Sequence, residues 1–154
     1  MPYRSTKTYG HEVGLSACFR QWRAASHCNK LHGYALSVGL VFEADTLDAR
    51  NWVVDFGGLK EVKAWLAEQY DHKTLVAHDD PEHAVFQAMQ VAGVADVLWV
   101  EAVGCEAFAK AIYDHVAEWL TFQGWGGAAG RVGRVKLVSV EVREHGANSA
   151  LYVG

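Results

Sequence analysis

The chain has 154 residues, a net charge of −4, 51% apolar residues and 21% charged residues. This length and balance are typical of one globular domain with a full hydrophobic core, and they exclude a disordered chain and a basic nucleic-acid-binding protein. No apolar run approaches the roughly 18 residues that a membrane span needs, and no apolar stretch follows the amino-terminal charges, so the sequence favours a cytoplasmic protein without a secretory signal.

The first part of the chain predicts two strands, Tyr9–Phe19 and His32–Ala44, joined by the polar loop Arg20–Lys30. In the second strand the apolar residues recur at every other position and therefore share one face of a sheet. These residues are Leu36, Val38, Leu40 and Phe42. The loop ends directly before this strand, which is a common place for functional residues because a sheet holds both ends of the loop.

The middle of the chain predicts helices. An amphipathic helix is expected over Leu59–Tyr70, with Asp55 or Gly57 near its start, and a longer one over Glu106–Phe122. Between them the pattern is mixed. It predicts a short helix and a short strand, over Glu82–Ala92 and Val97–Val100.

After the long helix, the glycine-rich residues 124–133 predict a loop, and Val135–Arg143 and Leu151–Val153 predict two further strands. The main elements therefore run strand, strand, helix, helix, strand, strand. Four strands with two helices on one face make an α+β layer whose outer edges are open, and oligomerisation would close them.

Several stretches, in this order and at these spacings, resemble the 6-pyruvoyl/6-carboxy-tetrahydropterin synthase family. They are Leu15–Phe19 with Cys28–Gly33, Trp52–Phe56 with Leu59 and Lys60, Tyr70–His72, and Val140–Glu144. The resemblance implies a single T-fold domain over residues 1–154, a ββααββ unit with a four-stranded antiparallel sheet and two helices on one face. It also implies a homo-oligomer, a trimer or hexamer closed into a barrel, with sites between subunits.

The same resemblance implies a carbon–oxygen lyase that acts on 7,8-dihydroneopterin triphosphate. The net charge of −4 without a basic stripe and the lack of a long apolar run predict no nucleic-acid or membrane partner. In bacteria the usual product is 6-carboxy-tetrahydropterin, on the route to queuosine. Such a reaction removes and returns protons on side-chain carbons, which requires a positioned acid and base.

Three residues resemble the family's proton-transfer groups: Cys28, Asp71 and His72. A cationic neighbour such as His27 would make Cys28 a better base, whereas an isolated cysteine is more often a small buried hydrophobe. In the Asp71–His72 pair the carboxylate would fix the imidazole tautomer, although Asp-His at a helix end is also a common solvated cap.

Substrate binding is expected at Glu144, which resembles the family's pterin-binding glutamate. A carboxylate can accept two parallel hydrogen bonds from the ring's amino group and N3. Strand alternation points one of Arg143 and Glu144 outward, so a solvent-facing role for Glu144 is the alternative. Cys105 and Glu106, at the start of the long helix, stand where backbone N–H groups could also bind the ligand.

The family's zinc is held by three histidines, and in this sequence the corresponding positions are Phe19, His32 and Tyr34. His32 is the one matched metal ligand, so we expect the ordinary zinc site to be absent. A substitute site would need His27 folded inward, or a bulge that turns Cys18 to the side of His32. Otherwise Arg20, Arg23 or the Tyr34 hydroxyl would have to replace the metal.

Two functions follow from these residues. The first is an enzyme that acts on a pterin side chain without zinc. It is favoured because the chain retains Cys28, Asp71, His72 and Glu144. Aromatic side chains at the metal positions favour the alternative, a non-catalytic oligomer that binds a pterin or purine.

Overall fold

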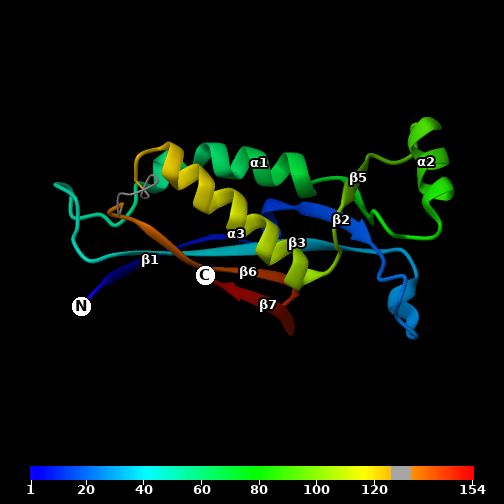
Figure 1. The fold of residues 1–154 in the computed structure, drawn as a ribbon, viewed down its shortest axis with the longest axis horizontal. Helices are drawn as coiled ribbons and strands as arrows, with labels where there is room; N and C mark the ends of the chain where they lie inside the picture. Colours follow the sequence, from blue (N-terminus) through cyan, green and yellow to red (C-terminus); the bar gives the residue numbers. More distant parts are fainter. Residues whose placement is uncertain (126–132) are drawn as a thin grey trace.

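The computed structural model describes residues 1–125 and 133–154 and shows one twisted sheet with two long helices on one face (Figure 1). A third, short helix packs against the other face of the last two parallel strands, where Phe86 meets Val76 and Val97. The strands are β1 (Tyr3–Tyr9), β2 (Leu15–Phe19), β3 (His32–Ala44), β4 (Lys73–Ala77), β5 (Val97–Val100), β6 (Lys136–His145) and β7 (Asn148–Val153). The α-helices are α1 (Lys60–Tyr70), α2 (His83–Val91) and α3 (Cys105–Phe122), and short 3-10 turns cover His11–Val13, His27–Asn29 and Phe56–Leu59.

The long strand β3 organises the sheet. Its first half pairs with β2 and its second half with β1, while its other edge pairs with β6, which in turn pairs with β7. These pairings are all antiparallel. Beyond β2, the strands β4 and β5 add in parallel, so the order is β5-β4-β2-β3-β6-β7 with β1 also on β3.

The core lies between the sheet and helices α1 and α3, which run side by side over one face (Figure 1). Alternate residues of β3 fill it, and Leu36, Val38, Leu40 and Phe42 are all at most 1% exposed. The long helix α3 contributes a stripe at helical spacing. Its buried residues are Cys105, Phe108, Ala109, Ile112, Val116 and Leu120.

The predicted α+β T-fold is confirmed, and the predicted helices and later strands agree with the structure to within a few residues. The first predicted strand is corrected, because Gly14 adopts a left-handed backbone (φ 78°) after the turn His11–Val13 and separates β1 from β2. The sheet also exceeds the four strands expected. The parallel strand β4 was not predicted from the sequence.

The predicted glycine-rich loop at 124–133 falls mostly on residues 126–132, which lie outside the described residues. Within the two described ranges, no helix combines the length and the apolarity that crossing a bilayer requires.

His115 on α3 gives the fold a pH-dependent contribution to stability. Its ring stacks on Trp65 of α1 at 3.7 Å between centroids and 5° between planes, and this burial lowers the pKa of His115 below 6.5 despite the opposing charge of Glu118. The unfolded chain therefore binds the proton more readily, so this contribution is complete above about pH 6.5 and is lost as the pH falls through the folded pKa.

We expect His115→Phe, which keeps a stacking ring, to flatten the acid side of the profile of unfolding free energy against pH. Denaturant titrations between about pH 7 and pH 5 measure this slope. His78→Gln, at an exposed position, serves as the control. An unchanged slope in His115→Phe would show that other groups cause the acid destabilisation.

Candidate functional site

Cys28 lies in the 3-10 turn His27–Asn29, within the loop that joins β2 to β3. The Ser26 side chain caps this turn by accepting a hydrogen bond from the Cys28 N–H at 3.4 Å. The Cys28 carbonyl accepts a hydrogen bond from the backbone N–H of Gln21 at 3.0 Å. Cys28 is partly buried, whereas the neighbouring His27 is exposed. The loop therefore holds the Cys28 backbone in a defined geometry just before the amino end of β3.

An aromatic cluster occupies the three positions at which the resemblance predicts zinc ligands. The ring centroids of Phe19 and His32 lie 5.7 Å apart, those of Phe19 and Tyr34 6.1 Å, and those of His32 and Tyr34 5.3 Å. Phe19 also packs edge-on against Phe108 of α3 at 5.1 Å. The three side chains that the sequence singled out thus share the helix-covered face of the sheet.

The Tyr34 hydroxyl group interacts electrostatically with three other predicted site residues. Burial raises the pKa of the Tyr34 phenol, and the neighbouring Glu144, Cys28 and Cys105 raise it further. Burial also raises the pKa of the Cys105 thiol to about 12, with Glu144 and Glu106 adding to this effect. Both groups therefore stay protonated at neutral pH and can act as hydrogen-bond donors.

Val140 and Val142 of β6 are buried on the helix-covered face, but the pairing of β6 with β7 shifts register between Arg143 and His145, so strict alternation does not extend to Glu144. The Glu144 carboxylate raises the pKa of both Tyr34 and Cys105, and this effect places it on the side of these two groups. Arg143 points to the other face, where its guanidinium pairs with Glu141 at 2.8 Å. At the start of α3, Cys105 is buried and Glu106 is exposed. Cys28, Tyr34, Cys105 and Glu144 thus form one group, which we call the Tyr34 group.

Asp71 and His72 follow the end of α1. His72 Nδ1 donates a hydrogen bond to Asp71 Oδ1 at 2.7 Å, and the Ser16 N–H donates to the same oxygen at 3.4 Å. Partial burial opposes ionisation of Asp71, but these hydrogen bonds outweigh it and lower its pKa. His72 has a left-handed backbone (φ 55°). Its side chain is 86% exposed, so Nε2 can exchange protons with a ligand.

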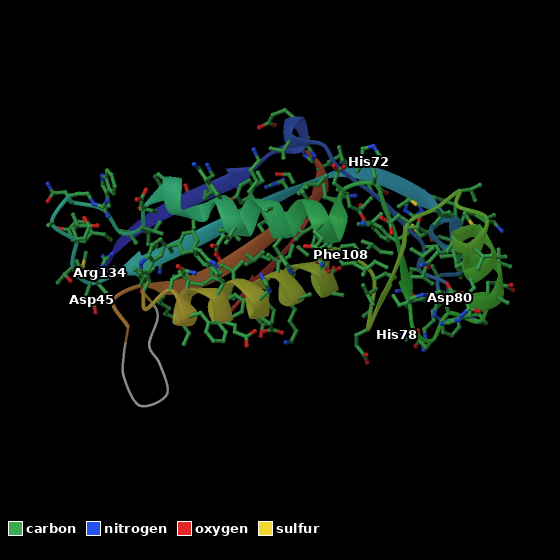
Figure 2. All side chains as sticks on the ribbon, turned by 90° about the horizontal axis from the view of Figure 1, so that it is seen from above. Asp45, His72, His78, Asp80, Phe108 and Arg134 are labelled. Atoms are coloured by element: carbon green, nitrogen blue, oxygen red, sulfur yellow. The ribbon has the colours of Figure 1, made fainter. Side chains whose placement is uncertain are left out.

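The structure does not bring the Asp71–His72 pair to the Tyr34 group. His72 lines a shallow cavity of about 240 Å³ together with Cys18 and Gly33. The β2–β3 register pairs Cys18 with Gly33 and Ala17 with Tyr34, and neighbouring residues on a strand point to opposite faces. Within one chain, His72 and the Tyr34 group therefore lie on opposite faces of the sheet. Figure 2 shows His72 just beyond α1.

The residues at the zinc positions do not fit a zinc ion. Phe19 has no donor atom, and phenol oxygens such as that of Tyr34 are uncommon zinc ligands. His32 Nδ1 donates to the Lys30 carbonyl at 2.7 Å, which leaves one imidazole nitrogen as the only ordinary ligand. In residues 1–125 and 133–154, no cluster of three or more histidine, cysteine or acidic side chains could hold a metal.

Neither substitute ligand considered from the sequence joins His32. The β2–β3 register is continuous, so no bulge turns Cys18, whose thiol instead contacts the Thr74 hydroxyl at 3.2 Å on the opposite face. His27 is exposed rather than folded inward. These two corrections follow from the unbroken pleat of β2 and from the capped turn that carries His27.

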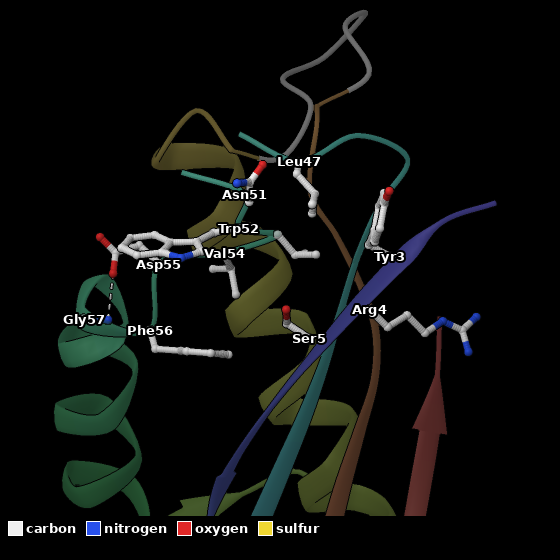
Figure 3. Close-up of a pocket in the computed structure, with 11 residues that line it drawn as sticks. Tyr3, Arg4, Ser5, Leu47, Asn51, Trp52, Val54, Asp55, Phe56 and Gly57 are labelled. Carbon is white, nitrogen blue, oxygen red and sulfur yellow. Dashed lines mark hydrogen bonds between the residues drawn. The ribbon is translucent and has the colours of Figure 1, made fainter. Parts of the chain in front are cut away.

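The Trp52–Phe56 stretch lines a different cavity, of about 490 Å³, together with residues of β1 (Figure 3). Asp55 caps the following turn by accepting a hydrogen bond from the Gly57 N–H at 2.9 Å, and Arg134 holds the loop by donating to the carbonyls of Trp52 and Val53. This loop follows the carboxyl end of β3, whereas Cys28 precedes its amino end. A 13-residue strand spans about 40 Å, so the two features lie at opposite ends of the chain's sheet.

The sequence is similar to those of known pterin synthases. The sequence model described as 6-pyruvoyl tetrahydropterin synthase matches residues 10–154. A 6-carboxy-5,6,7,8-tetrahydropterin synthase from Aquifex aeolicus is 28% identical over 165 residues, which cover 99% of this chain and 98% of that protein. One from Rickettsia felis is 36% identical over 56 residues, 36% of this chain and 41% of that protein.

Solved structures show the same fold. The crystal structure of an uncharacterized protein from Wolinella succinogenes superposes with a TM-score of 0.80 at 19% identity, over 99% of this chain and 98% of that one. The 6-pyruvoyl tetrahydropterin synthase from Plasmodium vivax gives a TM-score of 0.66 at 14% identity, over 99% and 97%. The fold therefore defines an α+β protein of the T-fold class. Within that class, the match over residues 10–154 shows that the chain belongs to the 6-pyruvoyl tetrahydropterin synthase family.

Sequence reasoning did not identify Asp80 as a neighbour of the site, and it considered Arg20 only as a replacement for the metal. In the structure these two side chains pair with each other at 2.6 Å. Asp80 follows the missed strand β4, so no sequence pattern indicated that it would face Arg20.

Proposed function

We propose that this protein is a pterin synthase-type lyase that acts on a dihydroneopterin triphosphate-like substrate by acid–base catalysis without zinc. The proposal is supported mainly by the Tyr34 group, in which the predicted thiol and the predicted pterin-binding carboxylate both act on the pKa of one neutral phenol, in a chain of this family.

In this proposal Glu144 binds the pterin ring by accepting two hydrogen bonds. Cys28, as a thiolate, takes a proton from a side-chain carbon of the substrate, and the electron pair of that bond forms a double bond while the neighbouring C–O bond breaks and the triphosphate leaves. The Asp71 carboxylate orients His72, which returns a proton through Nε2. Tyr34 is the proposed donor to a substrate oxygen that gains negative charge. A protonated phenol in a partly buried site can stabilise such a charge without being an ionised group itself.

The proposal requires more than one subunit. His72 lies on the opposite sheet face from the Tyr34 group, and the Trp52–Phe56 cavity lies at the other end of β3, so one chain cannot place them around one substrate. A second copy of this single T-fold domain, added through an exposed strand edge, can present its own His72 to the Tyr34 group of the first. A closed ring of three such copies, or two stacked rings, repeats that contact at every site.

The alternative is a binding-only oligomer, in which Glu144 still holds a pterin or purine ring but no turnover occurs. The specific observation in its favour is the aromatic cluster at the metal positions, where Phe19 supplies packing and no chemistry.

The test measures both binding and turnover. Purified protein is titrated with 7,8-dihydroneopterin triphosphate by calorimetry, and released triphosphate and the oxidised, fluorescent pterin product are followed by chromatography. We expect turnover in the wild type. In Glu144→Gln we expect binding weakened by about 10- to 100-fold, because the neutral amide offers one acceptor oxygen instead of two charged ones.

Glu141→Gln is the matched control, since Glu141 lies on the same strand but on the other face, paired with Arg143. It should leave binding unchanged. Binding without turnover in the wild type would support the binding-only alternative, and the absence of binding would refute both functions.

A further inference from the structure

The loop that carries Cys28 is tied to the segment between β4 and α2 by a buried ion pair. Arg20 Nε donates to Asp80 Oδ2 at 2.9 Å and Arg20 Nη2 donates to Asp80 Oδ1 at 2.6 Å, so the guanidinium and the carboxylate meet in a fork. The Asp80 side chain is 2% exposed and that of Arg20 19%. Such bidentate pairs fix geometry as well as distance.

Both ends of this ion pair are attached to rigid structure. The Asp80 N–H donates to the Ala77 carbonyl at the end of β4, and Asp80 Oδ1 accepts from the Glu82 N–H at 2.9 Å. Burial opposes ionisation of Asp80, but the hydrogen bonds from Arg20 and Glu82 lower its pKa, so it is a carboxylate at neutral pH. Asp80 therefore offers a fixed negative charge at the edge of the sheet.

The Arg20 side chain also reaches the residue after Cys28. Arg20 Nη1 donates to the Asn29 carbonyl at 3.1 Å, and the next residue, Gln21, donates its N–H to the Cys28 carbonyl at 3.0 Å. Two consecutive carbonyls of the turn that bears the thiol are thus held by Arg20 and Gln21. A continuous chain of hydrogen bonds leads from β4 through Asp80 and Arg20 to the backbone of Cys28.

A second ion pair joins the same two segments but is exposed. Arg23 Nη2 lies 2.8 Å from Asp79 Oδ2, with side-chain exposures of 60% and 51%, and Trp22 Nε1 donates to Asp79 Oδ1 at 3.2 Å. Exposed pairs contribute little because water screens them and both side chains lose rotamer freedom. The buried fork is therefore the main tie between the segments.

We propose that Arg20 and Asp80 are positioning residues, which hold the Cys28 thiol in place through the backbone of its turn. The inference rests on the proposed role of Cys28 and adds the segment after β4 to the functional site. Figure 2 shows Asp80 at the α2 end of the molecule. Its hydrogen bonds to Arg20 connect it to the loop between β2 and β3. The fork acts on the reaction only through Cys28. A misplacement of about 1 Å at a reacting group can lower a rate by about a hundredfold.

The experiment compares Asp80→Asn with Asp79→Asn in the full-length protein. Hydrogen–deuterium exchange reports the opening of residues 20–31, and iodoacetamide labelling followed by peptide mass spectrometry reports the accessibility of Cys28, with buried Cys105 as the internal reference. In Asp80→Asn we expect both rates to rise by about tenfold or more, since the partly buried Arg20 loses its charged partner. In Asp79→Asn we expect changes within about twofold.

Steady-state kinetics then connect the loop to the reaction. Asp80→Asn should lower kcat by about a hundredfold while KM changes little, because Glu144 still binds the ring. If Asp80→Asn does not fold, Arg20→Lys replaces it, since a lysine keeps the charge but loses the fork and the contact with Asn29.

Labelling and exchange of Asp80→Asn no faster than those of Asp79→Asn would overturn the inference. So would a lower melting temperature without a selective change in residues 20–31, since that result describes an ordinary structural pair. A failure of the proposed function can be told apart from a failure of this inference. If the wild type shows no turnover, the labelling and exchange rates of the two variants can still be compared.

Discussion

Mixing a Cys28→Ala chain with a His72→Ala chain should restore about a quarter of the wild-type turnover, although each variant alone is inactive. In the proposed oligomer each site takes its thiol from one chain and its imidazole from a neighbour. Random 1:1 association then makes about one interface in four that combines both intact residues. The prediction follows from the opposite faces that the two side chains occupy in the described chain.

The chains are mixed after mild dissociation and reassociated before the assay. A mixture of Cys28→Ala with Cys28→Ser serves as the control and should remain inactive, because no interface in it contains an intact thiol. If the first mixture also stays inactive after exchange of subunits has been verified by mass spectrometry, Cys28 and His72 do not act in a shared site.

Most of the fold could be predicted because its central elements carry a clear period. The alternation in β3 and the helical stripe of α3 are both long enough to be unambiguous, and each buries the face that the pattern predicts. The strand β4 escaped prediction for a physical reason. Four of its five residues are buried, as in parallel strands covered on both faces, so it shows no alternation and is too short to be recognised by its apolar run.

The sequence indicated candidate residues for the site but not how they are arranged. The order of the motifs indicated Cys28, Asp71, His72 and Glu144. The pairing of β2 with both β3 and β4 separates these residues between the two faces of the sheet. The spacing of residues within a motif does not show which strands will pair. The Arg20–Asp80 ion pair could not be predicted for the same reason, since it joins the loop after β2 to the segment after β4.

Restoring the two missing histidines should give this chain a zinc site. Three imidazoles bound tetrahedrally at a Zn–N distance of about 2 Å place their ring centroids about 5 Å apart. The rings of Phe19, His32 and Tyr34 already lie 5.3 to 6.1 Å from one another. His32 is also oriented in advance, because Nδ1 is bound to the Lys30 carbonyl and leaves Nε2 for a metal.

We therefore expect the double variant Phe19→His, Tyr34→His to bind about one zinc per chain by elemental analysis. Without metal it should be less stable than the wild type, because Phe19 loses its packing against Phe108, and added zinc should raise its melting temperature by mass action. Adding His32→Ala as a third change should abolish the binding. Two results would contradict this prediction. One zinc per chain in the tag-free wild type would show that the aromatic cluster does not replace the metal. No zinc in the double variant would show that the backbone at these positions no longer suits a tetrahedral site.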